Sequence, residues 1–313
     1  MKELQEKMIE WLFILFTTLL LPCFLTLLIT GTKEQENARK SGIMLEYEAG
    51  KKMDLEEFLP YMIAGEINLD YEEAALQAQA VIARTNLMRE LAGKKEAKCS
   101  DLSLAYLTPE QFQQGLGEKA EEKMWYKLKK AVESTYGQTL CYQGEYIEAL
   151  YHGISLGETV SAEEIFGKPR PYLIAVPSSQ DVEATDYMSV QDWEKAEVLA
   201  LLQKKKKAGN LTIETLFSGL QITEKTEHGY VKQVKVGEET MTGEEWKELF
   251  SLDSCNFYLE EQEGKLRVIT LGKGHGIGLS QYGANCMAKE KAGYREILQK
   301  YYPGTEIREG YKE

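Results

Sequence analysis

An uncharged apolar run near the start of the chain constrains its fold most. Residues 11–30 read WLFILFTTLLLPCFLTLLIT and contain no charged side chain. In a helix, a run of this length rises about 30 Å, which matches the hydrocarbon core of a bilayer. A cleaved signal peptide has a shorter apolar stretch followed by small residues, and Cys23 lacks the small residues that precede a lipoprotein cysteine. The run therefore predicts one uncleaved transmembrane helix.

The charge and the cysteines exclude several protein classes. The chain carries 37 Lys and Arg against 50 Asp and Glu, a net charge of -13. This argues against a nucleic-acid partner, because phosphates need a positive field. The five cysteines include no CxxC pair, and the only histidines are His152, His228 and His275. Their spacing indicates neither a zinc ribbon nor a disulfide scaffold, although one or two disulfides remain open.

An Ala-rich segment gives the clearest helix signal. Asp70 and Glu73 form a capping-box pattern ahead of AALQAQAVIARTNLMRELAG, which predicts a helix that ends near Gly93. An apolar stripe along it consists of Leu76, Ala80, Ala83, Leu87 and Leu91.

Further helices and hairpins follow along the chain. Helices are predicted over 110–134, 242–250 (behind a capping box at Thr242 and Glu245), 283–291 and 294–301. Strands are predicted over 139–142 and 146–151 as one hairpin, over 230–236, and over 256–260 and 265–270 as a second hairpin. No βαβ rhythm is present, so we expect an α+β fold: a single ectodomain of mixed helices and antiparallel hairpins behind one N-terminal transmembrane helix. Residues 31–43 would be a juxtamembrane linker and 44–313 the domain.

Two charged residues stand in apolar surroundings. Glu66 follows an apolar run just before the Ala-rich helix, where partial burial would raise its pKa and suit it to act as a general acid. The alternative is a solvent-facing Glu at the end of a segment. Arg84 lies within AVIARTN and either positions a polar ligand or forms a structural ion pair.

A glycine-rich loop at 272–284 reads GKGHGIGLSQYGA. Four glycines surround His275, and Ser280, Gln281 and Tyr282 follow. Such glycine density lets the backbone approach a ligand closely and adopt positive φ. The loop has neither the GK[ST] of a phosphate loop nor a βαβ unit around it. His275 is either a base or a residue that holds the loop in place.

These elements, in this order, resemble the SpoIID/LytB family. The matching segments are AGEI at 64–67, AALQAQAVIART at 74–85, GQTLCYQG at 137–144, SLGET at 155–159, the His275 loop, and YYPGT at 301–305. The resemblance covers about residues 44 to 308, and the His275 loop is its most specific part.

The resemblance implies a membrane-anchored lytic transglycosylase. Such enzymes cleave peptide-free peptidoglycan strands between N-acetylmuramic acid and N-acetylglucosamine and leave 1,6-anhydromuramyl ends. Glu66 would be the catalytic acid and then the base. Arg84, His275, Ser280, Gln281 and Tyr282 would bind the glycan or brace Glu66.

The resemblance also implies a setting in septal wall remodelling and engulfment during sporulation. It places residues 1–10 in the cytoplasm and the domain outside the cell membrane, on the septal or engulfing membrane of the mother cell if the chain serves sporulation. The expected partners are glycan strands, a cell-wall amidase, a multispan membrane protein of the engulfment complex and the membrane itself, with no nucleic acid.

Some positions depart from the family pattern. Ile67 and Asn68 stand where Met-Pro is usual, and Leu279 replaces a Met. Some relatives carry a His-Cys pair that could hold zinc, but Leu104 and Ala105 occupy that place here. We therefore expect no cofactor.

Two other classes of function stay open. One is a non-catalytic, membrane-tethered glycan-binding module that recruits or stimulates a cell-wall amidase. The other is a thiol or serine hydrolase that pairs His275 with Cys286 or Ser280, although the nucleophile-elbow pattern GxSxG is missing.

Overall fold

The computed structural model describes residues 40–115 and 118–311, together with 11, 16 and 21. The expected tail 1–10, the expected span apart from those three residues, and residues 31–39 of the expected linker lie outside the described part. Among the described helices, none combines the length and the apolar character needed to cross a membrane. The chain divides into two compact units, Met1–Phe58 with Lys94–Asp101, and Leu59–Gly93 with Leu102–Glu313.

The first unit contains a small sheet that the sequence patterns did not predict. Its strands are β1 (Met44–Glu48), β2 (Lys51–Asp54) and β3 (Glu96–Lys98), followed by the turn η2 (Cys99–Asp101). The order is β2-β1-β3, with β1 antiparallel to β2 and parallel to β3. The Asp54 carboxylate accepts hydrogen bonds from the main-chain N–H groups of Ser41 (3.1 Å) and Gly42 (3.0 Å), which fixes the entry to β1. Helix α3 (Leu55–Ala64) starts here and continues into the second unit.

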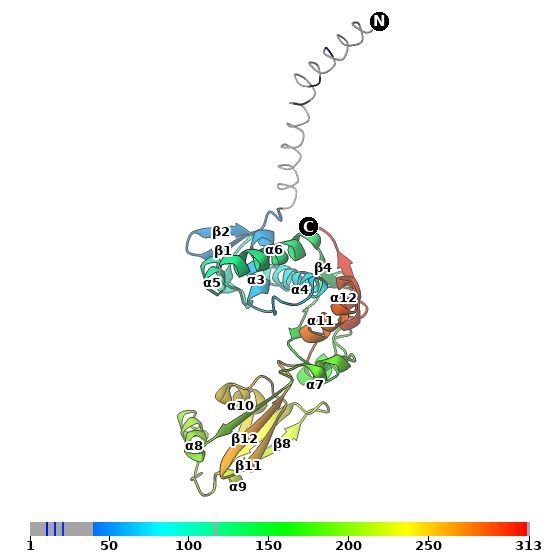
Figure 1. Cartoon of the computed structure of the whole chain (residues 1–313). Coiled ribbons are helices and arrows are strands. Elements are labelled where there is room, and N and C mark those ends of the chain that lie inside the picture. The colour runs from blue at the N-terminus through cyan, green and yellow to red at the C-terminus, as the bar shows by residue number, and fades with distance from the viewer. Residues whose placement is uncertain (1–10, 12–15, 17–20, 22–39, 116–117, 312–313) are drawn as a thin grey trace. The chain divides into compact units, whose positions relative to one another are not determined.

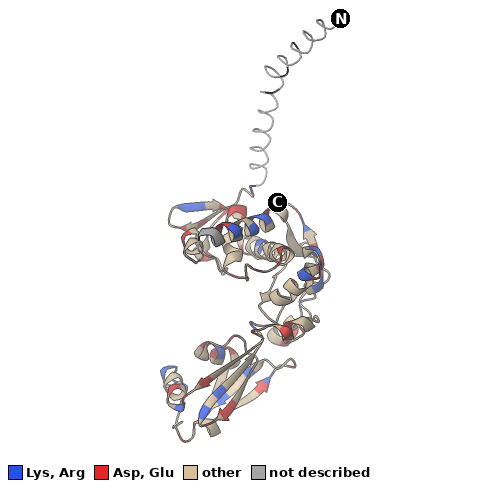
Figure 2. Cartoon of the chain, viewed as in Figure 1, with Lys and Arg blue, Asp and Glu red and all other residues tan. Residues whose placement is uncertain are grey.

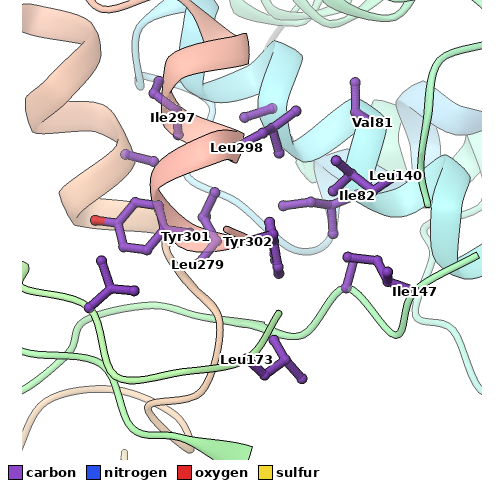
Figure 3. Packing of buried hydrophobic residues seen from close by; sticks show 14 of the residues in the cluster. Val81, Ile82, Leu140, Ile147, Leu173, Leu279, Ile297, Leu298, Tyr301 and Tyr302 are labelled. Carbon is purple, nitrogen blue, oxygen red and sulfur yellow. The ribbon is translucent and has the colours of Figure 1, made fainter. Parts of the chain in front are cut away.

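Helix α4 (Glu73–Leu91) is the centre of the second unit (Figure 1). It contacts α6 (Glu118–Ser134), α11 (Gln281–Lys289), α12 (Tyr294–Tyr301) and β4 (Thr139–Tyr142). All five residues of the predicted stripe are buried, and Figure 3 shows Val81 and Ile82 of the same helix among side chains of α12 and of the chain around β4. The predicted helix is therefore confirmed, and it is buried on more than one face.

The predicted N-terminus of this helix is wrong. The N-cap is Glu72 rather than Asp70, and no side-chain cap is formed. Instead, the buried side chain of Asn285 in α11 accepts a hydrogen bond from the Glu72 N–H at 2.9 Å. A residue more than two hundred positions away thus replaces the local cap.

Two other local predictions need correction. The helix expected over 110–134 is two helices, α5 (Pro109–Gly115) and α6. The second strand of the first hairpin is only β5 (Glu145–Tyr146). The chain leaves that sheet because β6 (Tyr151–His152) pairs in parallel with β13 (Leu279–Ser280), next to the glycine-rich loop. On its other edge, β4 pairs with β14 (Glu306–Arg308).

Residues 188–271 form two three-stranded sheets around their own apolar core; we call this part the β-region. The sheet orders are β10-β9-β8 and β11-β12-β7. The strands are β7 (Met188–Trp193), β8 (Leu220–Lys225), β9 (Val231–Val236), β10 (Glu239–Thr242), β11 (Phe257–Gln262) and β12 (Lys265–Leu271), and the helices are α8 (Lys195–Lys204), α9 (Leu216–Gly219) and α10 (Gly243–Phe250). Trp246, Phe250 and Phe257 are fully buried in its core.

The sequence predictions for the β-region are largely confirmed. The capping box is present, since Thr242 Oγ1 accepts from the Glu245 N–H at 3.0 Å and the Glu245 carboxylate accepts from the Thr242 N–H at 2.8 Å. The hairpin of β11 and β12 turns at Glu263 and Gly264, both at positive φ. Before the β-region lie α7 (Ala162–Phe166) and η3 (Ser179–Glu183), which the patterns did not predict.

Candidate active site

A tight turn between α3 and α4 presents Glu66. The main-chain N–H groups of Glu66 and Ile67 both donate to the Ile63 carbonyl, at 3.0 and 3.2 Å. Ile67 is buried, whereas the Glu66 side chain is half-buried. The carboxyl group therefore lies at the edge of the core and is only partly exposed to solvent.

Three side chains hold Glu66. The buried Gln79 of α4 donates from Nε2 to Oε2 of Glu66 at 3.5 Å, and the Tyr151 hydroxyl forms a hydrogen bond with the same carboxyl group. Gln281 of α11 donates from Nε2 to the Glu66 main-chain carbonyl at 2.8 Å and to Gln79 Oε1 at 3.4 Å. Residues from β6 and α4 thus contact the carboxyl group of Glu66, and a residue from α11 contacts its main chain.

Burial raises the pKa of Glu66 from 4.5 to about 7, and the hydrogen bonds from Tyr151 and Gln79 lower it only in part. Because burial disfavours the charged form, a substantial fraction of Glu66 stays protonated near neutral pH. A carboxyl group with such a pKa can both donate and accept a proton in one reaction cycle.

The glycine-rich loop has the conformation that its sequence predicted. Its glycines at 272, 274, 276 and 278 all have positive φ, between 70 and 93°. The side chain of His275 is exposed, and its Nδ1 accepts a hydrogen bond from the Ile277 N–H at 3.1 Å. On the other side of the same residue, Nδ1 of the buried His152 donates to the Ile277 carbonyl at 3.1 Å.

Both imidazoles are neutral in this arrangement. Burial lowers the pKa of His152 to about 3, with a further contribution from His275. The pKa of His275 is also lowered, first by desolvation of the part of the ring that faces the protein and then by Lys247. His275 also has a hydrogen-bonding interaction with the main chain of Tyr151. The loop is therefore fixed beside the residue that contacts Glu66.

The three residues after the loop have different roles. Ser280 is fully buried and caps α11, because its Oγ accepts from the Gly283 N–H at 3.1 Å. Gln281 braces Glu66, as described above. Tyr282 is half-buried, and its N–H donates to the Gly153 carbonyl at 3.0 Å. Of the three, Tyr282 is the one with side-chain surface to offer a ligand.

Arg84 is a fully buried residue of α4. Its guanidinium donates to the Gln138 carbonyl at 3.0 Å and to the Val132 carbonyl at 3.4 Å. These contacts tie α4 to the chain that leaves α6 and enters β4. A side chain without exposed surface has nothing to offer a glycan, so the contacts of Arg84 are structural.

The geometry gives no support to a thiol or serine nucleophile. The Ser280 hydroxyl is occupied as a helix cap in the core. Cys286 forms a hydrogen bond with Tyr282, and burial raises the pKa of its thiol. A raised pKa reduces the thiolate fraction that such chemistry needs.

The described part of the chain also contains no group of three or more His, Cys, Asp or Glu side chains arranged to hold a metal ion. Cys99 is buried, and burial raises the pKa of its thiol to about 11. All four cysteines in the described part, at positions 99, 141, 255 and 286, are free.

Sequence reasoning missed Gln79 and Tyr151. A weak signal for Gln79 exists, because it is a polar residue on the buried side of an Ala-rich helix. Tyr151 gives no such signal, because its contact with Glu66 depends on the pairing of β6 with β13.

Comparisons with known proteins identify the family of this chain. The family described as "Stage II sporulation protein" (SpoIID) matches residues 45–142, which include Glu66, Gln79 and Arg84. Stage II sporulation protein D of Bacillus subtilis (strain 168) is 33% identical over 268 residues, which cover 83% of this chain and 76% of that protein. The protein of the same name from Bacillus amyloliquefaciens is 30% identical over 267 residues, covering 83% of this chain and 75% of its own length.

A more distant relative is the amidase enhancer of Bacillus subtilis (strain 168). It is 26% identical over 226 residues, which cover 57% of this chain and 32% of that protein. The identity and coverage of the two sporulation proteins, together with the match that includes Glu66, show that the chain belongs to the SpoIID family of stage II sporulation proteins.

Proposed function

We propose that this protein is a lytic transglycosylase that cleaves peptide-free glycan strands of peptidoglycan. The observation that carries the proposal is the Glu66 carboxyl group, which has a pKa of about 7 and is held by Gln79 and Tyr151. A single carboxyl group of this kind suffices when the substrate supplies its own nucleophile, whereas hydrolysis of a glycoside uses a second carboxylate.

In the first step, protonated Glu66 donates its proton to the oxygen that joins C1 of N-acetylmuramic acid to C4 of N-acetylglucosamine. The bond from C1 to this oxygen breaks, and N-acetylglucosamine leaves with a 4-hydroxyl group. Glu66, now a carboxylate, accepts the proton of the muramyl 6-hydroxyl as that oxygen bonds to C1. The product is a 1,6-anhydromuramyl end, and Glu66 returns to its protonated form.

The neighbouring residues position Glu66. Gln79 and Tyr151 orient the carboxyl group, and Gln281 fixes the main chain on which it stands. Asn68 shapes the turn that follows Glu66, because its Oδ1 accepts from the Asp70 N–H at 2.9 Å. His275 holds the loop beside Tyr151, and the half-buried Tyr282 supplies side-chain surface for the sugar.

The proposed setting is wall remodelling at the septal and engulfing membrane during sporulation. Residues 11–30 would anchor the chain, with the domain outside the cytoplasm. A cell-wall amidase that removes stem peptides would supply the substrate, and a multispan membrane protein of the engulfment complex would be a further partner. The names of the two sporulation relatives and of the amidase enhancer support this setting. No cofactor is required by the steps above.

The test uses the full-length chain and peptide-free glycan strands, with mass spectrometry of the new ends. Wild-type protein should release anhydromuramyl ends, and Glu66→Gln should reduce their formation by about a hundredfold or more, as expected for loss of a general acid. Glu57→Gln is the matched control, because Glu57 is an exposed residue of α3. It should retain full activity. Equal activity in Glu66→Gln would remove Glu66 from the mechanism.

The relative named amidase enhancer favours a second candidate function, a non-catalytic glycan-binding module that stimulates an amidase. This function predicts that Glu66→Gln stimulates a purified cell-wall amidase as well as wild type does. It also predicts glycan binding without anhydromuramyl ends. Formation of those ends by wild type and their loss in Glu66→Gln would decide for the enzyme.

A further inference from the structure

A groove of about 440 Å³ lies in the β-region, between β8 and β11. It is lined by all of β8 and by residues 258–260 of β11. Each of these strands is the last of its sheet, β8 in the order β10-β9-β8 and β11 in the order β11-β12-β7 (Figure 1). Within the described part of the chain, the groove is therefore bordered by two strand edges that have no hydrogen-bonded neighbour strand.

The hydrogen-bond pattern shows which groups of β11 point into the groove. The Leu271 N–H donates to the Asn256 carbonyl at 2.9 Å, and the register pairs Tyr258 with Ile269. Since bonded and non-bonded pairs alternate in an antiparallel ladder, Phe257 and Leu259 direct their N–H and C=O groups away from β12. Lys225 of β8 donates from Nζ to the Phe257 carbonyl at 3.4 Å, which places that carbonyl on the β8 side.

The same reasoning applies to β8. The Gly237 N–H donates to the Gly219 carbonyl at 2.8 Å, and Leu220 pairs with Val236 in register. Leu220 and Ile222 therefore direct their main-chain groups away from β9. Their side chains, like that of Leu259, are half-buried and pack against the core of the β-region. The groove thus combines two polar main-chain edges with an apolar floor.

Lys225 adds a positive charge at one end of the groove. Its Nζ lies 4.0 Å from the centre of the Tyr258 ring, and the side chain is half-buried. Burial lowers its pKa. No ion pair joins it to any carboxylate in the described part of the chain, and the neighbouring Glu224 pairs with Lys232 instead. A half-buried ammonium group without an anion favours a ligand that brings one.

We propose that this groove binds an extended segment of a partner polypeptide, which adds as a strand between β8 and β11 and places an acidic side chain against Lys225. The main-chain groups of the added strand would form hydrogen bonds with the two strand edges. Its alternate apolar side chains would pack on the floor formed by Leu220, Ile222 and Leu259. The partner segment therefore has apolar residues at every second position and a carboxylate on its outer face. This goes beyond the proposed reaction, which takes place at Glu66.

The probe is a set of fluorescent, end-blocked heptapeptides of alternating Val and Thr, in which one Thr is replaced by Asp at each position in turn. A matched set carries Asn in place of Asp. Binding to the full-length chain is measured by fluorescence anisotropy, and hydrogen exchange locates it. One Asp peptide should bind about tenfold more tightly than its Asn counterpart, the gain expected for one charge-assisted contact. The amides of Ile222 and Leu259 should become protected.

Lys225→Gln should abolish the preference for Asp while binding of the Asn peptide persists. Lys204→Gln, an exposed residue of α8, is the control that removes one charge from the same region and should change nothing. Circular dichroism verifies that both variants fold. Failure of every Asp peptide to bind, protection elsewhere than β8 and β11, or an Asp preference that survives in Lys225→Gln would each overturn the proposal.

Discussion

The charged form of Glu66 destabilises the folded protein. Burial raises its folded-state pKa from 4.5 to about 7, so the folded state holds this proton more tightly than the unfolded chain does. Below the unfolded pKa both states are protonated and there is no penalty. As the pH rises through the folded pKa, the penalty reaches its full value, at most about 3 kcal/mol.

Replacing Glu66 by Gln should therefore stabilise the protein at alkaline pH. Gln keeps the shape and the hydrogen bonds to Gln79 and Tyr151 but cannot ionise. We expect a higher melting temperature for Glu66→Gln than for wild type near pH 8, and a difference that disappears near pH 4.5. Thermal unfolding at the two pH values checks this. A variant that is less stable than wild type at pH 8 would show that burial does not penalise the carboxylate.

Tyr151 affects the pKa of Glu66. Its hydrogen bond lowers the pKa of Glu66, because it favours the charged form. Tyr151→Phe should raise that pKa, so that the decline of cleavage activity at alkaline pH moves to higher pH. The measurement is the pH dependence of kcat/KM for glycan cleavage by both proteins. A role limited to packing would lower the activity equally at every pH and leave the position of the decline unchanged.

At the scale of helices and strands, the sequence predicted the elements that are specified by residues close together in the chain. The capping box at Thr242, the turn at Gly264 and the apolar stripe of α4 depend on residues within a few positions of one another. The pairing of β6 with β13 and the Asn285 contact at the start of α4 join segments more than a hundred residues apart. No short-range pattern encodes such contacts, so the contact of Tyr151 with Glu66 was not predictable.

Gly283 shows how tightly α11 packs against η3 and α12. A Cβ atom at this position would lie 2.2 Å from the Tyr301 hydroxyl and 2.3 Å from Ser178 Oγ. Gly283→Ala should therefore destabilise the protein by about 1–3 kcal/mol through overpacking. Gly293→Ala is the control, because nothing lies within 4 Å of its Cβ position.

Chemical denaturation measures both glycine variants. Since Gln281 lies on the same helix, Gly283→Ala should also reduce glycan cleavage. A Gly283→Ala protein as stable as Gly293→Ala would contradict the packing seen around α11.

At the scale of the molecule, the excess of acidic residues is spread over the chain. Figure 2 shows acidic and basic residues on the same helices and strands of the described part of the chain. The acidic composition argues against nucleic acid as a partner, because phosphates need a positive field. The partial burial and raised pKa of Glu66 were predicted from the sequence. Its hydrogen bonds with Gln79 and Tyr151 could be identified only from the three-dimensional structure.

The pH dependence of glycan cleavage by the full-length protein tests the central claim most directly. A reaction that needs protonated Glu66 should keep a constant kcat/KM at acidic pH and lose about tenfold per pH unit above a pKa of about 7. The measurement follows anhydromuramyl ends released from peptide-free strands between about pH 5 and about pH 9. A kcat/KM that stays constant or rises across this range would show that Glu66 is not the acid.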